Sequence, residues 1–146
     1  MKLYVAVGIL LASVCALTSA AKFEIRDHED ALKAHEECRA ERKIPDEIYE
    51  QFLNYEFPEH KNTNCYVKCF LEKMGLFTEL KGFNQKNIIA QFTHKNTKDL
   101  ATVQHGLEKC IDLNEWGTDT CTWANRVFSC WNKINRPVVR KTYGAN

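Results

Sequence analysis

Residues 64–77 read NCYVKCFLEKMGLF, a run in which two cysteines stand four positions apart. Side chains at that spacing point the same way from a helix, so Cys65 and Cys69 are placed to bond partners on other segments rather than each other. Gly75 follows the run, and a glycine at this position is typical of a helix end. The pattern predicts a helix over 64–74 that two disulfides tie to other segments.

The remaining cysteines extend this framework. The chain has 7 cysteines, and because Cys15 falls in the N-terminal leader described below, an even set is left, as in small secreted proteins with three disulfides. Cys121 and Cys130 are nine residues apart, which at about 100° per residue places them on opposite faces of one helix. Excluding direct bonds within the pairs Cys65 and Cys69, and Cys121 and Cys130, leaves ten of the 15 possible pairings open. The six cysteines of this set are Cys38, Cys65, Cys69, Cys110, Cys121 and Cys130.

The first 21 residues have the pattern of a secretory signal peptide. Lys2 precedes an apolar run too short to span a membrane, and small residues then allow cleavage after Ala20 or Ala21. We therefore interpret 1–21 as the signal and 22–146 as one secreted, extracellular domain. No later apolar run has membrane-spanning length, so we expect no membrane insertion.

The charge balance argues against two classes of partner. The chain has 20 basic and 19 acidic residues, and loss of Lys2 with the signal leaves a formal charge of zero. Proteins that bind nucleic acid or anionic membranes normally carry a one-sided basic excess. We expect neither kind of partner.

Apolar residues recur at helical spacing along the chain, and no run alternates as a strand does, which predicts an all-α domain of about six short helices. Capping residues and prolines set their approximate bounds. Residues 137–146, which begin with a proline, are expected to form an irregular C-terminal tail. The predicted helices span 28–42, Pro45 to a stop before Pro58, 64–74, the segment after Asn84 through Phe92, Thr97 or Asp99 to Ile111, and Asp119 or Thr120 to Asn132.

The sequence does not suggest catalysis, a metal or a cofactor. There is no C-x2-C pair and no histidine pair three or four residues apart. His28 and His35 are seven apart in a highly charged segment and are expected to be solvated surface residues. Ser129 is the one serine after the leader, and it accompanies no nucleophile or phosphate-loop motif. We therefore predict that the protein is not an enzyme.

The cysteine spacing Cys38-x26-Cys65-x3-Cys69-x40-Cys110-x10-Cys121-x8-Cys130 resembles the six-cysteine signature of the insect odorant-binding proteins, and residues 64–77 resemble their third helix. Tyr55-Glu56-Phe57-Pro58 and Gly82-Phe83-Asn84 are similar to the general odorant-binding proteins of flies. The resemblance covers 27–134. It implies six helices around an apolar cavity, tied by three interlocked disulfides. The implied pairs are Cys38–Cys69, Cys65–Cys121 and Cys110–Cys130.

The resemblance also implies an extracellular carrier of small hydrophobic ligands such as odorants or pheromones, with a membrane chemoreceptor as a further partner and a monomeric or weakly dimeric state. Its helices would present apolar side chains to the cavity, Trp131 directly after the sixth cysteine foremost among them. Taken alone, such stripes are more often ordinary core. Tyr66 or a threonine could orient a ligand hydroxyl. The candidate ligand-binding residues are Phe70, Met74, Ile88, Phe92, Val103, Leu107, Val127, Phe128 and Trp131.

The sequence does not distinguish between several roles for such a carrier, or between two roles for its C-terminal tail. A carrier in haemolymph, saliva or reproductive fluid, or a scavenger of lipophilic compounds, would have the same sequence features as an olfactory carrier. The tail contains Val138, Val139 and Tyr143, which could cover the cavity as a lid or could belong to a frayed end. Acid-triggered release through such a lid would need a histidine acting across helices, and His94 and His105 are the candidates.

Overall fold

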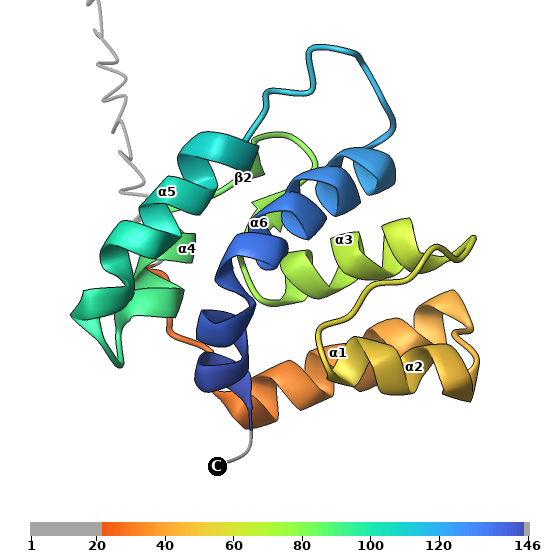
Figure 1. Ribbon diagram of the computed structural model, residues 1–146. Coiled ribbons are helices and arrows are strands. Elements are labelled where there is room, and N and C mark those ends of the chain that lie inside the picture. The colour runs from red at the N-terminus through yellow and green to blue at the C-terminus, as the bar shows by residue number, and fades with distance from the viewer. Residues whose placement is uncertain (1–21, 145–146) are drawn as a thin grey trace, which may run out of the picture.

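The computed structural model describes residues 22–144, so the predicted signal peptide lies outside the described part of the chain. Its architecture is all-α, with a small two-stranded hairpin, as Figure 1 shows. The predicted six helices are confirmed. The elements are α1 (His28–Arg42), α2 (Asp46–Leu53), α3 (Thr63–Lys73), β1 (Phe77–Thr78), β2 (Gly82–Phe83), α4 (Gln85–Thr93), the 3-10 turn η1 (Thr97–Asp99), α5 (Leu100–Cys110) and α6 (Thr120–Tyr143).

Side-chain caps fix where several helices begin. The Asp27 carboxylate accepts a hydrogen bond from the Asp30 amide at 3.0 Å, and the Asp30 carboxylate accepts one from the Asp27 amide at 3.2 Å. Asn84 caps α4 and Asp119 caps α6 in the same way, each accepting from the amide three residues on. Gly75 follows α3 with φ at 70°, the left-handed conformation that suits glycine at a helix end.

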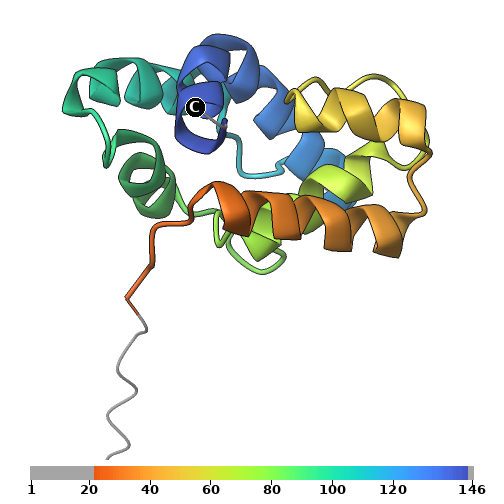
Figure 2. The ribbon, with the colours of Figure 1, turned by 90° about the horizontal axis from the view of Figure 1, so that it is seen from below.

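Helices α3 and α6 form the centre of the molecule, and the other helices pack around them. Figure 1 shows α5 against one side of α6 and α1 beneath α3, and Figure 2, seen from below, shows α1 extended along the lower side. Gly106 allows α5 to approach α6 closely, because a Cβ atom there would overlap the side chains of Asn135 and Trp131.

Three disulfides fasten these helices together. They join Cys38 to Cys69, Cys65 to Cys121 and Cys110 to Cys130, which links α1 to α3, α3 to α6, and α5 to α6. These are the pairs that the family resemblance implies, and neither direct pair excluded by helix geometry occurs. Constraining the unfolded chain in this way stabilises a small domain by several kcal/mol.

The prediction that the C-terminal tail is irregular was wrong. Helix α6 is 24 residues long in all, ends at Tyr143 and includes Pro137 in its interior. A proline inside a helix costs about 3 kcal/mol because it removes one backbone hydrogen bond and crowds the preceding turn. Val138, Val139 and Tyr143 are buried in the core beyond it, and this apolar burial offsets that cost.

Two smaller differences concern local backbone geometry. Helix α2 ends at Leu53 instead of continuing toward Pro58, because Tyr55 adopts a left-handed φ of 56° that is incompatible with the helix. The hairpin of β1 and β2 was not expected, since strands of two residues are too short to show an alternating pattern. Gly82 in this hairpin packs directly on the Trp123 ring, where a Cβ atom would overlap the ring.

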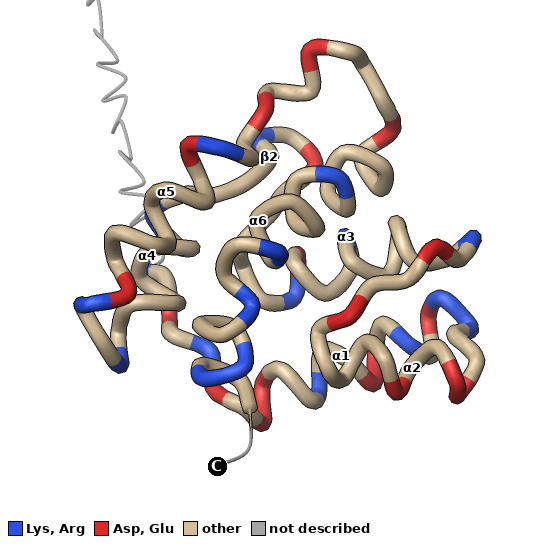
Figure 3. Tube along the Cα trace, in the orientation of Figure 1, with Lys and Arg blue, Asp and Glu red and all other residues tan. Residues whose placement is uncertain are grey.

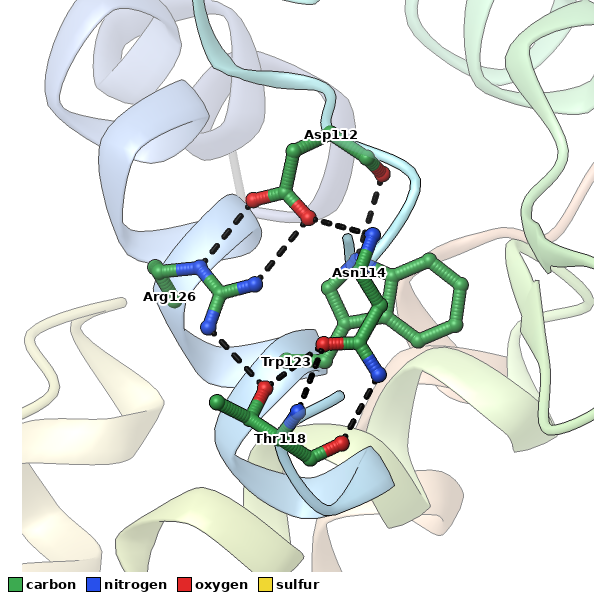
Figure 4. Close-up of polar contacts among 5 residues, drawn as sticks. All are labelled: Asp112, Asn114, Thr118, Trp123 and Arg126. Atoms are coloured by element: carbon green, nitrogen blue, oxygen red, sulfur yellow. Dashed lines mark hydrogen bonds and ion pairs between the residues drawn. The ribbon is translucent and has the colours of Figure 1, made fainter. Parts of the chain in front are cut away.

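Polar contacts fasten the connection between α5 and α6, as Figure 4 shows. Arg126 donates two hydrogen bonds of 3.0 Å to the two carboxylate oxygens of Asp112, and Trp123 Nε1 donates to the Asp112 carbonyl. The Arg126 guanidinium holds the pKa of the Asp112 carboxyl below its usual value. Asn114 bonds both the backbone and the hydroxyl of Thr118, so the loop between the two disulfide-bearing helices is well fixed.

Candidate ligand-binding core

The nine predicted ligand-binding residues meet in one buried cluster. None of them is more than 4% exposed, and they come from α3 and the residue after it, α4, α5 and α6. Side chains would converge in this way both around a binding cavity and in an ordinary core. Contact of these residues with a ligand therefore stays a prediction. These residues are Phe70, Met74, Ile88, Phe92, Val103, Leu107, Val127, Phe128 and Trp131.

Aromatic side chains connect this cluster into a closed circuit. Each member lies 4.1 to 6.3 Å from the next, measured between ring centroids, the separation at which aromatic pairs attract. We call this set the aromatic circuit. In order around it, the members are Phe52, Tyr66, His35, Phe70, Tyr143, Phe92, Trp131, Phe128 and Phe57.

His35 is a member of the circuit, so the prediction that it is a solvated surface residue was wrong. The imidazole is 1% exposed, its Nδ1 is hydrogen-bonded to the Tyr66 hydroxyl, and burial lowers its pKa to about 4. Ala31, Ala34 and Cys38 share its face of α1. Because two of these neighbours are small alanines among many charged residues, the buried face of α1 has a weak sequence signal.

Tyr66, suggested above as a residue that orients a ligand, already has a partner for its hydroxyl in His35. Burial raises the pKa of this phenol, so it is protonated at neutral pH. Tyr66 thus holds the imidazole through Nδ1 and leaves the other ring nitrogen, Nε2, without this contact. That ring nitrogen is buried and has no hydrogen-bond partner among residues 22–144.

Tyr143 was missed as a core residue because the helix was expected to end before it. It stacks on Tyr55 at 6.0 Å and contacts Phe70 and Phe92 at 6.3 and 5.5 Å. Its hydroxyl is buried without a hydrogen-bond partner in the described chain. Residues 127, 131, 135, 139 and 143 are spaced by four, and that row would have revealed the continuing helix had Pro137 not been read as its end.

Two asparagines add polar groups to the buried face of α6. Asn132 Nδ2 donates to the Tyr55 carbonyl at 2.9 Å, and Asn135 Nδ2 donates to the Trp131 carbonyl at 3.2 Å. The side-chain oxygen of each is buried without a partner in the described residues. An interior with several such atoms is unusual for a well-packed core, where buried polar groups are almost always paired.

A pocket of about 510 Å³ leads from the surface to this region, between α1, the end of α2 and the end of α6. His35 and Tyr143 both contribute to its wall. The pocket is lined by His28, Leu32, His35, Leu53, Asn54, Tyr55, Arg140, Tyr143 and Gly144.

The histidine that touches the end of α6 is His28, whereas His94 and His105 were suggested from the sequence. His28 Nδ1 is hydrogen-bonded to the Tyr143 carbonyl, while His94 Nδ1 bonds the Gln91 carbonyl within its own segment and His105 is exposed. Figure 1 shows the last turns of α6 descending to the start of α1, where this contact is made.

Figure 3 shows acidic and basic residues intermixed along the chain. Within 22–144, no group of three histidine, cysteine or carboxylate side chains is arranged to hold a metal ion. None of the helices described here is long and apolar enough to cross a bilayer.

Two similar proteins match nearly the whole chain. General odorant-binding protein 99a of Drosophila melanogaster is 31% identical over 142 residues, covering 97% of this chain and 96% of its own. Odorant-binding protein 22 of Aedes aegypti is 34% identical over 140 residues, covering 96% of each.

Solved structures agree on the fold. A mosquito juvenile hormone-binding protein superposes with a TM-score of 0.71 at 16% identity over 84% of this chain, which spans 47% of that longer protein. An odorant-binding protein of Locusta migratoria superposes with a TM-score of 0.59 at 14% identity over 86% of this chain and 99% of its own. The profile of the PBP/GOBP family matches residues 20–134. The chain therefore belongs to the PBP/GOBP family of insect odorant-binding proteins.

Proposed function

We propose that the protein is an extracellular carrier that binds a small hydrophobic ligand inside the aromatic circuit and transports it through aqueous fluid. The observation that carries this proposal is an interior that joins a closed circuit of aromatic side chains to several buried polar atoms without partners. An ordinary core would pair or exclude such atoms. Removing apolar ligand surface from water supplies the affinity, at about 25 cal/mol per Å².

Three disulfides support a carrier role. A cavity large enough for a ligand costs stability, and cross-links that restrict the unfolded chain offset that cost. The bonded cysteines lie on α1, α3, α5 and α6, around the buried cluster rather than inside one helix pair. The frame therefore holds the walls of the cluster when its contents change.

We further propose that the ligands are odorants or pheromones and that the fluid is the lymph of olfactory sensilla, with delivery to a membrane chemoreceptor. The names of the two relatives that match nearly the whole chain support this choice. Immunolocalisation checks it. Staining confined to haemolymph, saliva or reproductive fluid would replace olfaction with another transport or scavenging role and leave the carrier function intact.

Displacement of a hydrophobic fluorescent probe from the recombinant mature protein tests the carrier function. Binding should be saturable, and Trp131→Ala should weaken it by about 1–3 kcal/mol, the scale of one buried aromatic contact. Trp116→Ala is the matched control, because Trp116 is 75% exposed on the loop between α5 and α6. Equal affinities of a folded Trp131→Ala variant and wild type would assign Trp131 to the core alone.

A further inference from the structure

Resting on the carrier function proposed above, we infer that the ligand's oxygen-bearing end lies between His35 Nε2 and the Tyr143 hydroxyl, and that the preferred ligands are uncharged alcohols. Both atoms are buried without a hydrogen-bond partner in the described chain, and both side chains are 1% exposed. A buried polar atom without a partner is costly, so a ligand that supplies one gains affinity.

The two side chains belong to the wall of one pocket. His35 and Tyr143 both line the 510 Å³ pocket. They also share two neighbours: Tyr55 lies 5.5 Å from His35 and 6.0 Å from Tyr143, and Phe70 lies 4.3 and 6.3 Å from them, between ring centroids. A ligand entering between these residues meets both polar atoms at the edge of the aromatic circuit.

The charge state of the two groups selects an uncharged partner. Burial lowers the pKa of His35 to about 4 and raises the pKa of Tyr143 well above its ordinary value, so both are neutral at pH 7. Of the charges near Tyr143, Arg26 and Asp30 act in opposite directions on that pKa. Because these two opposite charges offset each other, a carboxylate or an ammonium group would gain little net attraction to set against the high cost of its burial.

Arg140, the arginine that lines the pocket, already has hydrogen-bond partners. Arg140 is half exposed there and bonds the Asn54 carbonyl and the Glu56 carboxylate, each at 3.4 Å. Arg136 shares the same Glu56 carboxylate at 3.6 Å. The side chains of these pairs are partly exposed, whereas the two polar atoms without partners in the described residues are buried.

A hydroxyl is the group that matches both atoms at once. The Tyr143 phenol can donate and accept, and His35 Nε2 donates in one imidazole tautomer and accepts in the other. A hydroxyl does both and fits either tautomer. A ketone or ester oxygen only accepts and matches one arrangement, and an alkane leaves both atoms unpaired.

The experiment compares four probes of equal chain length, 1-decanol, 2-decanone, decane and decanoate, on wild type and on Tyr143→Phe. The variant removes one oxygen and keeps the ring. We expect its affinity for 1-decanol to fall about 3- to 10-fold, the worth of one hydrogen bond, and its affinity for decane to stay within twofold. His35→Asn, which keeps a polar atom for the Tyr66 hydroxyl but lacks Nε2, should show the same selective loss.

Tyr49→Phe is the matched control, since Tyr49 is a buried tyrosine of α2 outside this pocket, and it should change neither affinity. Equal losses for 1-decanol and decane in both variants would overturn the inference and leave packing as their role. Tighter binding of decanoate than of 1-decanol, unaffected by Tyr143→Phe, would also overturn it. Failure of every probe to bind wild type would instead refute the carrier function.

Discussion

The Nδ1 atom of His35 is hydrogen-bonded to the Tyr66 hydroxyl in the interior, between α1 and α3, which the Cys38–Cys69 disulfide also joins. The imidazole stacks on Phe70 at 4.3 Å and lies edge-on to Tyr55 at 5.5 Å. The titratable groups facing it are therefore two phenols that burial keeps protonated. Burial is the cause of the lowered pKa of His35, with no charged group of residues 22–144 compensating it, so the neutral imidazole is strongly favoured.

This environment predicts a stability that falls in acid. The pKa of His35 is about 4 in the folded protein against 6.5 in the unfolded chain. Between these values the unfolded state binds a proton that the folded state does not, so the free energy of unfolding decreases as pH falls through this window. We expect a loss of about 2 kcal/mol between pH 7.5 and pH 5 from this group.

Urea unfolding of the disulfide-intact protein at both pH values measures this loss. His35→Asn cannot titrate, and its stability should change less over the same range. His105→Asn, at an exposed histidine of α5, is the control and should keep the wild-type pH dependence. Equal slopes for His35→Asn and wild type would mean that His35 contributes nothing to the acid sensitivity.

Gly106→Ala is expected to destabilise the protein although alanine is the better helix former. The helix propensity gains about 1 kcal/mol. Against this, the new methyl would come within 2.9 Å of the rigid Trp131 ring and would overlap Asn135, and overpacking of this kind costs about 1–3 kcal/mol. The net loss should be up to about 2 kcal/mol in urea unfolding, with weaker probe binding because Trp131 must move. Thr102→Ala, on the exposed face of α5, should show neither effect.

Pro137→Ala is expected to stabilise α6. Pro137 is exposed in the helix interior, so the substitution removes no core contact and restores an amide donor to the preceding turn. We expect a gain of about 1–3 kcal/mol in the free energy of unfolding. Lys133→Ala, one turn earlier on the exposed surface, should stay within about 0.5 kcal/mol of wild type. A destabilised Pro137→Ala variant would show that the proline favours the native course of α6.

The disulfides predict an order of stability losses. In the chain-entropy view the gain grows with the length of the closed loop. The sequence separation is 20 residues for Cys110 and Cys130 and 56 for Cys65 and Cys121. Replacing each pair by alanines should cost about 3 and about 4 kcal/mol respectively.

Peptide mapping of the unreduced protein should recover the three bonds, and a Cys65–Cys69 bond would contradict the helical placement of those residues.

Sequence patterns predicted the helices wherever a local signal was strong. Asp27, Asn84 and Asp119 cap helices within the predicted bounds, and Gly75 ends α3, because capping and left-handed glycines depend on near neighbours alone. The pairing of the cysteines depends on how the helices lie relative to one another. Cysteine spacing reduced the number of possible pairings but could not select one, so the predicted pairing came from the family resemblance.

The candidate site was predicted only in its apolar half. Phe92 and Trp131 follow helical stripes, but the burial of His35 depends on the tertiary approach of α3 to α1, which a charged helix sequence conceals. Tyr143 was expected in an irregular tail or lid and not in a helix, because a proline ordinarily stops a helix. Its burial by Phe70 and Phe92 outweighs that local rule.

We expect the last turns of α6 to cover the binding core. Val139 and Tyr143 are fully buried, and Tyr143 contacts Phe70, Phe92 and Tyr55, so this segment closes one side of the aromatic circuit. We expect a chain truncated after Arg136 to exchange ligand faster than wild type in stopped-flow displacement, because one side of the aromatic circuit then loses its cover. It should also be less stable, since three apolar side chains leave the core.

Two comparisons separate these effects. Truncation after Gly144 keeps the whole of α6 and should exchange ligand at the wild-type rate. Val139→Ala should lower stability while the cover remains in place, so its exchange rate should change less than that of the longer truncation. The truncation after Arg136 also removes the contact between His28 Nδ1 and the Tyr143 carbonyl, which joins the start of α1 to the end of α6. Identical exchange rates for the protein truncated after Arg136 and for wild type would show that ligand leaves by another route.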